Sequence, residues 1–322
     1  MSSPISSEQL NHSAGYGRKE RPGRYDVGQG IHMSVIKSSE PLSLDKTLAS
    51  GQTFRWTKTE DNRWMGFIEE DRFLLRQLDP ADFTLQLECR TSPGVDVKSK
   101  IENYFNLDDK YEEMAKSLNA DPLVESALAA NKGLRLLSQD PWETLISFIL
   151  SSASNIPRIK GNIARLCESY GTPETDVFGE YHGFPVPETL AQATASDFER
   201  LRFGYRAEYV WKTALRIAEE PQFLPNLRTM PYEDAKRELC SLHGVGEKIA
   251  DCVLLFSLGF TEAFPVDTWI KKIISENYFD GRSLSVKKIA EFGRGKFGKY
   301  AGYVQQCLFE YVRNGKSESA AD

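Results

Sequence analysis

The residue whose type and setting most clearly indicate chemistry is Lys248. It follows two glycines in the stretch Leu-His-Gly-Val-Gly-Glu-Lys, which ends at Lys248. A turn between two helices, formed by Gly244, Val245 and Gly246, presents backbone N–H groups that can bind a phosphate. A lysine attacks carbon as the neutral amine, which partial burial and the positive end of a helix both favour. The pattern predicts a nucleophilic lysine beside an anion-binding turn, whereas a lysine considered alone is usually an exposed residue on a helix face.

Asp267 is the carboxylate that we expect to lie beside Lys248. It stands in Phe-Pro-Val-Asp-Thr-Trp, where an aspartate before a helix is typical of an N-cap. A capping carboxylate that also faces a pocket can stabilise a developing positive charge and assist proton transfer. We therefore predict that Asp267 caps a helix and works with Lys248.

Helical patterns that position these two residues extend from about residue 99 nearly to the end of the chain. Helices over 231–242 and 247–258 flank the glycine turn and predict a helix-hairpin-helix motif at 231–258. Further helices are expected over 267–277 and 303–313. Asp140 followed by a proline is a helix start, and residues 196–199 are interpreted as a capping box.

Short strands are predicted before the helices, between about Val35 and Arg90. Residues 63–68 and 72–76 flank an acidic turn, as in a hairpin, and residues 83–87 alternate as a strand does. The fold class that follows is α+β, with an N-terminal antiparallel β-layer packed on an all-α bundle. We divide the chain into a disordered N-terminal extension (1–33), a mainly antiparallel β domain (34–120) and a helical domain (121–322).

Composition excludes several classes of protein. Of the 322 residues, 40% are hydrophobic and 27% charged, as in globular proteins. The longest apolar run, near residues 252–260, is too short to cross a bilayer, and the N-terminus lacks the apolar core of a signal peptide. We therefore expect a cytoplasmic monomer that makes no contact with a membrane.

The five cysteines are widely spaced and include no Cys-x-x-Cys pair. This spacing predicts neither a disulfide framework nor a metal site, and it cannot supply the four cysteines of an iron–sulfur loop. No cofactor is expected, although an ion in the glycine turn cannot be read from sequence. The net charge is −6, yet residues 286–316 hold seven basic and two acidic residues, which fits either nucleic-acid binding or a solvated helix face.

Several motifs together resemble the 8-oxoguanine DNA glycosylase/AP lyases of the helix-hairpin-helix superfamily. They are the hairpin with its lysine and aspartate, Ser-Gly-Gln-Thr-Phe-Arg-Trp at 50–56, and the segments 141–152 and 203–210. The resemblance extends from about Leu44 to Arg313, and Thr268-Trp269 is similar to bacterial members. It implies a base-excision repair enzyme, nucleoid-associated in a bacterium, that acts on double-stranded DNA containing 8-oxoguanine. Lys248 would capture C1′ of the damaged nucleotide as a Schiff base, and β-elimination would nick the strand.

The resemblance also implies a pocket for the flipped base. The backbone carbonyl of Gly51 would accept the N7–H that 8-oxoguanine has and guanine lacks. Gln305 would read the Watson–Crick edge, while Phe309 and Cys252 would cover the two faces of the base. Gln305 and Phe309 are i and i+4 on one helix, as are Lys248 and Cys252, so each pair shares a face.

Three further residues would occupy and read the space that the base leaves in the duplex. By the same resemblance, Tyr205 would enter the stack, and Arg158 and Arg206 would read the orphaned cytosine. Family members carry an asparagine after Ser-Ser at this place, whereas this chain has Ala153, with Asn155 two residues later. The strictness of selection for cytosine therefore stays open.

Two alternatives remain from the sequence. A sister glycosylase of the superfamily would remove alkylated purines or oxidised pyrimidines, but the first kind generally lacks the lysine and the second usually carries the iron–sulfur loop. A non-catalytic damaged-DNA-binding protein would use the hairpin only to hold phosphate. Borohydride trapping distinguishes them, because only a lysine nucleophile becomes covalently linked to damaged DNA.

Overall fold

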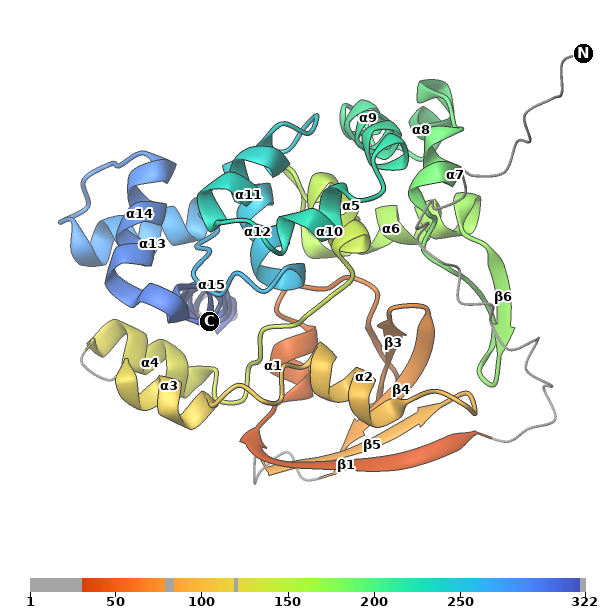
Figure 1. Cartoon of the computed structure of the whole chain (residues 1–322). Helices are drawn as coiled ribbons and strands as arrows, with labels where there is room; N and C mark the ends of the chain where they lie inside the picture. Colours follow the sequence, from red (N-terminus) through yellow and green to blue (C-terminus); the bar gives the residue numbers. More distant parts are fainter. Residues whose placement is uncertain (1–30, 79–83, 119–120, 319–322) are drawn as a thin grey trace, which may run out of the picture.

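The computed structural model of the chain describes residues 31–78, 84–118 and 121–318. Figure 1 shows a β-sheet at one end of the molecule, two short helices against it, and a larger helical body beyond them. The predicted α+β architecture is confirmed. Most of the predicted extension, residues 1–30, lies outside the described part. Within that part, no helix is both long and apolar enough to cross a membrane.

The N-terminal layer is an antiparallel sheet with the strand order β1-β5-β4-β3-β2. Its strands are β1 (His32–Pro41), β2 (Thr57–Lys58), β3 (Trp64–Ile68), β4 (Asp71–Gln77) and β5 (Thr84–Thr91). β3 and β4 form the predicted hairpin, in which Ile68 pairs with Asp71. His32 and Met33 belong to β1 and pair with β5, although the local pattern assigns them to the extension. Pairing with a strand far along the chain orders these two residues.

Helices α1 (Leu44–Leu48) and α2 (Val97–Tyr104) lie between the sheet and the helical body (Figure 1). Trp56 is fully buried there, and its indole N–H donates to the Tyr104 hydroxyl over 2.8 Å. The ring packs so closely on Gly66 of β3 that a Cβ at this glycine would lie 2.2 Å from it. The end of the 50–56 motif is therefore fixed between the sheet and α2.

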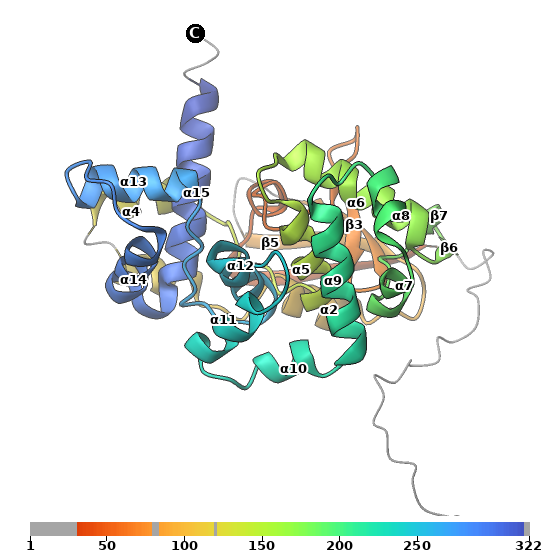
Figure 2. The same cartoon turned by 90° about the horizontal axis from the view of Figure 1, so that it is seen from above.

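The helical body holds the predicted hairpin pair and the long C-terminal helix. Its helices are α3 (Tyr111–Ser117), α4 (Pro122–Ala130), α5 (Pro141–Leu150), α6 (Ile156–Tyr170), α7 (Pro187–Ala191), α8 (Ala195–Arg200), α9 (Arg206–Glu219), α10 (Phe223–Leu227), α11 (Tyr232–Cys240), α12 (Glu247–Ser257), α13 (Thr268–Tyr278), α14 (Val286–Phe297), the 3₁₀ turn η1 (Gly298–Tyr300) and α15 (Ala301–Glu318). Figure 2 shows α15 running lengthwise beside α13 and α14, and it also packs on α4. The helices predicted over 231–242, 247–258, 267–277 and 303–313 correspond to α11, α12, α13 and α15 within a few residues.

Helix starts test the local predictions directly. Asp140 caps α5 as predicted, since its carboxylate accepts the Glu143 N–H over 2.7 Å. The capping box predicted at 196–199 is wrong by two residues. Thr194 and Asp197 instead exchange side chain–backbone bonds of 3.3 and 2.9 Å, because the capping oxygen must lie just before the helix, which begins at Ala195.

A second hairpin, β6 (Pro173–Asp176) and β7 (Gly179–His182), is absent from the sequence predictions. Its strands are short and mostly polar, so they lack the alternation that predicts a strand. A buried ion pair holds the hairpin to the sheet: Arg72 of β4 donates to Asp176 over 2.9 Å and to the Gly179 carbonyl over 2.7 Å. Both charged side chains are less than a tenth exposed.

We expect Arg72→Met to lower the free energy of unfolding by about 3–5 kcal/mol, since it leaves the Asp176 carboxylate buried without its partner. Combining it with Asp176→Leu should recover much of that loss. Urea denaturation measures both effects, with Arg76→Met at an exposed position of the same strand as the control. A single variant as stable as the control would contradict the assigned role of the pair.

Candidate active site

The hairpin between α11 and α12 requires glycine at one position. Gly244 has φ = +81°, and a Cβ there would lie 2.3 Å from the ring of Tyr209. Val245 is buried and donates its own N–H to the Leu242 carbonyl over 3.1 Å, so this amide is used inside the turn. Gly246 caps α12 without a side-chain hydrogen bond. The donors available to a phosphate are therefore those at the start of α12 rather than the Val245 amide that the sequence also suggests.

Lys248 is half-buried on the first turn of α12. Its Nζ lies 5.0 Å from the ring centroid of Phe148, and the side chain hydrogen-bonds the buried Cys252 thiol one turn further along. Burial raises the pKa of Cys252 to about 11, with Lys248 acting in the opposite direction, so the thiol is protonated and serves as an uncharged wall. The predicted i, i+4 pair therefore shares one face, beside an aromatic ring that the sequence does not single out.

Asp267 is the N-cap of α13, as predicted: its Oδ1 accepts the Ile270 N–H over 2.8 Å. Burial raises the pKa of Asp267 above its usual value, while the Ile270 N–H and the charge of Lys248 lower it. The charge of Asp267 also acts on Cys252. The structure therefore brings the lysine, the thiol and the carboxylate into one site at the starts of two helices.

The turn that contains Gly51, residues 49–52 (hereafter the Gly51 turn), is fastened from two sides. Gly51 itself has φ = +77°, which favours glycine. On one side, Gln52 is buried and hydrogen-bonds the Arg135 carbonyl and the Leu137 N–H over 2.8 and 2.9 Å. On the other side, Gln306 of α15 donates to the Ser50 carbonyl over 2.9 Å. The carbonyl of Gly51 is thus held by contacts with segments far away in the sequence.

The predicted base-reading residues lie on α15. Gln305 is buried, and within the described ranges its Oε1 has no hydrogen-bond partner. Phe309, one turn along, is half-buried. α15 reaches α12 where Gly302 meets Leu255, so closely that a Cβ at the glycine would lie 2.2 Å from a leucine methyl. An unpaired buried acceptor is costly unless a ligand supplies the donor.

Phe148 connects the 50–56 motif to the lysine, a link that the sequence does not reveal. Phe54 of the motif contacts Phe148 edge-on with a centroid distance of 5.6 Å, and Phe148 stacks on Phe256 at the same distance. Lys248 lies over the Phe148 ring. Only the apolar character of residues 145–150 signals this role, and that character is equally typical of ordinary core packing.

The three residues predicted to act in the opposite strand differ in their surroundings. Tyr205 is 54% exposed, and its hydroxyl donates to the Ser152 carbonyl over 3.3 Å. Arg158 is exposed on the first turn of α6 and, in the described part, forms no ion pair. Arg206 is buried and donates to the carbonyls of Ser152 and Ala153. In this state Arg206 shapes the loop, and only Arg158 and Tyr205 are presented at the surface.

Ala153 and Asn155 lie in the loop where the family resemblance leads us to expect an asparagine. Ala153 has φ = +45°, a conformation in which asparagine is common and alanine is strained. Asn155 caps α6, since its Oδ1 accepts the Arg158 N–H over 3.0 Å. The carbonyl oxygen of Asn155 is thereby engaged, and the amide that could reach a base is missing at position 153.

Comparison with known proteins decides the family. Residues 34–145 match the 8-oxoguanine DNA glycosylase N-terminal domain, and residues 146–297 match the HhH-GPD superfamily base excision DNA repair proteins. The chain is 35% identical to the N-glycosylase/DNA lyase OGG1 of Arabidopsis thaliana, over 83% of this chain and 76% of that protein. It belongs to the 8-oxoguanine DNA glycosylase/lyase family.

Two further relatives agree with this assignment. The N-glycosylase/DNA lyase of Saccharomyces cerevisiae is 32% identical over 88% of this chain and 87% of its own length. The 8-oxoguanine glycosylase/lyase of Clostridium acetobutylicum, crystallised with dsDNA containing cytosine opposite 8-oxoG, superposes with a TM-score of 0.80 at 32% identity, covering 88% and 98% of the two chains. The predicted family, its bacterial type, and the enzyme class of N-glycosylase and DNA lyase in base-excision repair are confirmed.

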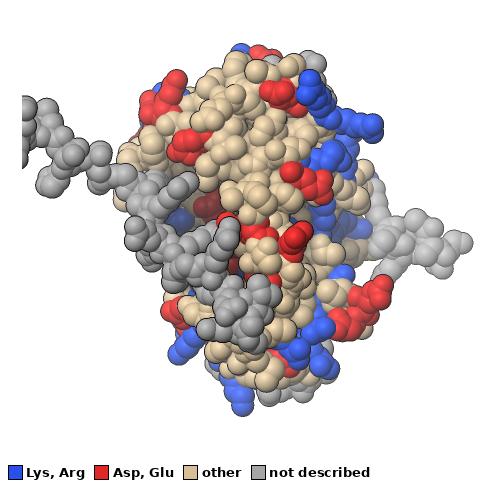
Figure 3. All heavy atoms as spheres, turned by 90° about the vertical axis from the view of Figure 1, so that its right-hand side faces the viewer, with Lys and Arg blue, Asp and Glu red and all other residues tan. Residues whose placement is uncertain are grey.

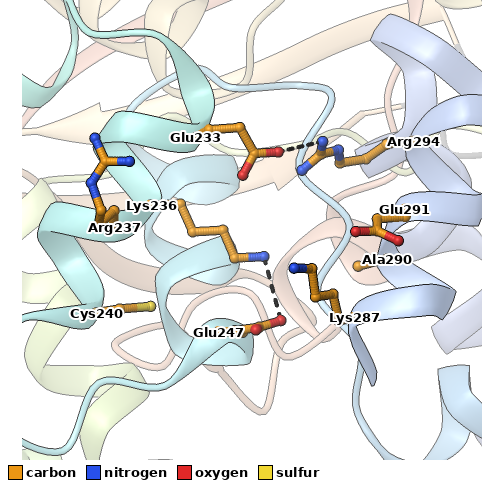
Figure 4. Close-up of a pocket in the computed structure, with 9 residues that line it drawn as sticks. All are labelled: Glu233, Lys236, Arg237, Cys240, Glu247, Lys287, Ala290, Glu291 and Arg294. Atoms are coloured by element: carbon orange, nitrogen blue, oxygen red, sulfur yellow. Dashed lines mark hydrogen bonds and ion pairs between the residues drawn. The ribbon is translucent and has the colours of Figure 1, made fainter. Parts of the chain in front are cut away.

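A separate pocket of about 260 Å³ in this glycosylase/lyase lies between α11, α12 and α14 (Figure 4). In Figure 4, Lys236 points toward Glu247, and Glu233 toward Arg294, and each pair forms an ion pair. None of the residues that line it belongs to the base pocket. Among the described residues, no buried acceptor in its lining lacks a hydrogen-bond partner, in contrast to Gln305.

The positive segment 286–316 is partly neutralised in the glycosylase/lyase fold. Arg294 pairs with Glu233, and Lys296 pairs with Asp121, so acids from outside the segment reduce its charge. Figure 3 shows the right-hand side of Figure 1, away from α13 and α14, and there acidic and basic side chains border a broad uncharged area. Helix N-termini and a few exposed cations are therefore a better basis for phosphate binding than net charge.

The hairpin of the glycosylase/lyase offers a matched pair of glycine variants. Gly244→Ala should lower the free energy of unfolding by about 1 kcal/mol or more and weaken DNA binding, because it adds a Cβ against Tyr209 at a positive φ. Gly246→Ala should be much milder, since φ is −96° and nothing lies within 4 Å of the added Cβ. Thermal melting and fluorescence anisotropy with duplex DNA measure the two effects. Equal losses in the two variants would argue against this account of the turn.

Proposed function

We propose that Lys248 is the nucleophile of this glycosylase/lyase and that its substrate is 8-oxoguanine in double-stranded DNA. The observation that carries the proposal is the half-buried amine of Lys248 on the first turn of α12, together with the half-buried Asp267 carboxylate at the cap of α13, whose charges act on each other. Phosphate contacts at the Gly244–Gly246 turn would place the damaged strand across this amine. The Clostridium acetobutylicum relative, crystallised with dsDNA that contains 8-oxoG, supports the same class of ligand.

In the proposed chemistry, the glycosidic bond breaks as positive charge develops on the deoxyribose, and Asp267 stabilises that charge. The neutral amine of Lys248 forms a bond to C1′, and the base leaves with the electron pair of the broken bond. The amine nitrogen then loses a proton and the C1′–O4′ bond breaks, which opens the sugar ring and gives the Schiff base. The Schiff base acidifies the C2′ proton. Loss of that proton expels the 3′ phosphate by β-elimination and nicks the strand. Asp267 is the nearby group that can accept and return protons in these steps.

Selection of the lesion is assigned to the predicted base pocket. The Gly51 carbonyl would accept N7–H, while Cys252 and Phe309 would enclose the base. Gln305 supports this assignment, because its buried Oε1 lacks a partner and the Watson–Crick edge of a flipped purine carries N–H donors. A base that pairs with Gln305 relieves a desolvation cost that the free enzyme bears.

In the opposite strand, Tyr205 would fill the stack and Arg158 would contact the orphaned base. Arg206 would assist by holding the loop carbonyls or, after releasing one of them, by reaching the base itself. We further propose that the enzyme acts as a cytoplasmic monomer without a bound cofactor, associated with the nucleoid in a bacterial cell.

Lys248→Gln should abolish the borohydride-trapped complex and strand cleavage while leaving duplex binding in place. Asp267→Asn should reduce turnover by about 10²-fold or more, since asparagine keeps the helix cap but lacks the negative charge. Single-turnover assays on 8-oxoguanine duplexes measure both, and Lys272→Gln at an exposed position of α13 is the control. Retained trapping in Lys248→Gln would place the nucleophile elsewhere.

Replacement of Ala153 tests opposite-base selection. Ala153→Asn suits the positive φ and adds the missing amide, so we expect discrimination for cytosine to sharpen by about tenfold, the effect of one good base contact. Ala153→Gly relieves the same backbone strain without an amide and should leave discrimination unchanged. Excision of 8-oxoguanine opposite each of the four bases is the measurement. Sharpening in both variants would attribute the effect to the backbone instead.

A further inference from the structure

The inner face of α15 does more than carry the base-reading pair. Gln306 and Arg313 both donate to the Gly51 turn, to the Ser50 and Ala49 carbonyls respectively, over 2.9 Å in each case. These two carbonyls directly precede Gly51. The helix that presents Gln305 and Phe309 to the base therefore also fixes the turn whose carbonyl would read N7–H.

Glu310 is the unusual member of this face. Its side chain is only 4% exposed, and its Oε2 lies 2.7 Å from the Arg313 guanidinium, which is itself 27% exposed. Burial raises the pKa of Glu310 to about 7, against the opposing influence of Arg313. A buried carboxylate contributes little net stability, and an apolar side chain of similar size usually serves a core as well or better. Packing alone does not account for an acid at this position.

The ion pair between Glu310 and Arg313 fixes the orientation of the guanidinium, which an apolar side chain at position 310 would not do. One nitrogen of Arg313, Nη2, donates hydrogen bonds to both the Glu310 carboxylate and the Ala49 carbonyl. The planar guanidinium is held in one orientation by the first contact and delivers the second. Nη1 of Arg313 also lies 3.8 Å from the position that a Cβ at Gly51 would take, and Cζ of Arg313 lies 5.7 Å from the centroid of the Phe309 ring. The arginine is thus between the turn and the aromatic residue that would stack on the base.

We propose that Glu310 and Arg313 are positioning residues for lesion recognition: the Glu310 carboxylate orients Arg313, which holds the Gly51 turn where its carbonyl meets N7–H. The proposal rests on the proposed role of Gly51. It separates recognition of the base from the chemical step, because capture of C1′ by Lys248 does not involve the Gly51 turn. An abasic site has no base to read, so its cleavage should not depend on the pair.

The experiment compares two substrates in the full-length enzyme. The variants are Glu310→Gln, Arg313→Met and Arg313→Lys, and the substrates are duplexes with 8-oxoguanine or an abasic site opposite cytosine. We expect the single-turnover rate of 8-oxoguanine excision to fall by about 10- to 100-fold, as for small misplacements of a reacting group. Cleavage and borohydride trapping on the abasic duplex should stay within about twofold of wild type. The 8-oxoguanine excision rate of Arg313→Lys should lie between those of wild type and Arg313→Met, since lysine keeps the positive charge but lacks the planar guanidinium with its several N–H donors.

Controls separate positioning from folding. Asp234→Asn and Arg237→Met remove an exposed ion pair with the same i, i+3 spacing on α11, and they should leave the rates on both duplexes unchanged. Burial disfavours the charged form of Glu310, so the melting temperature of Glu310→Gln should not fall below that of wild type. If the other two variants fold poorly, Arg313→Lys is the variant on which the two substrates are compared. Equal losses on both duplexes, or no loss on either, would overturn the proposal. Failure of the wild type to trap on 8-oxoguanine DNA would instead refute the proposed function.

Discussion

The interaction around which the candidate site is arranged is the electrostatic one between a half-buried amine and a half-buried carboxylate at the starts of two helices. Lys248 on the first turn of α12 and Asp267 at the cap of α13 each lie where backbone N–H groups point into the site. That field stabilises the carboxylate of Asp267. The glycine turn, the buried Cys252 thiol and the Phe148 ring lie around this pair.

The proposed pocket for the base is built from segments that lie far apart in the sequence. The Ser50 carbonyl and Gln306 are 256 residues apart in sequence, yet they are hydrogen-bonded in the buried interior. Gln52 adds a second anchor to the segment around Arg135 and Leu137. Since such contacts form only after the sheet and the helical body meet, the proposed N7–H acceptor depends on correct docking of both layers. The catalytic pair, in contrast, is assembled from neighbouring helices.

This difference explains which features the sequence predicts. The hairpin, the N-caps of α5 and α13, and the order of sheet and helices follow from local patterns, and the family motifs supply the base pocket. The β6–β7 hairpin cannot be predicted from a local pattern, because a buried ion pair between Arg72 and Asp176 holds it in place and its strands lack alternating apolar residues. Nor can the internal use of the Val245 amide and the burial of Arg206, which depend on how loops meet in space. The roles of Phe148 and Gln306 also need the tertiary contacts.

The loop at Ala153 illustrates how one substitution redistributes a function. With alanine at a positive φ and Asn155 engaged in capping α6, the loop is held chiefly by the Arg206 guanidinium and the Tyr205 hydroxyl through the Ser152 carbonyl. Tyr205 and Arg206, which we propose to act in the opposite strand, are here hydrogen-bonded to their own loop. An exposed Arg158 is left as the group able to approach that strand without breaking a bond in the protein. In the proposed function, selection of the opposite base and selection of the lesion therefore rest on separate groups: the exposed Arg158 side chain for the first, and the carbonyl of the doubly anchored Gly51 turn for the second.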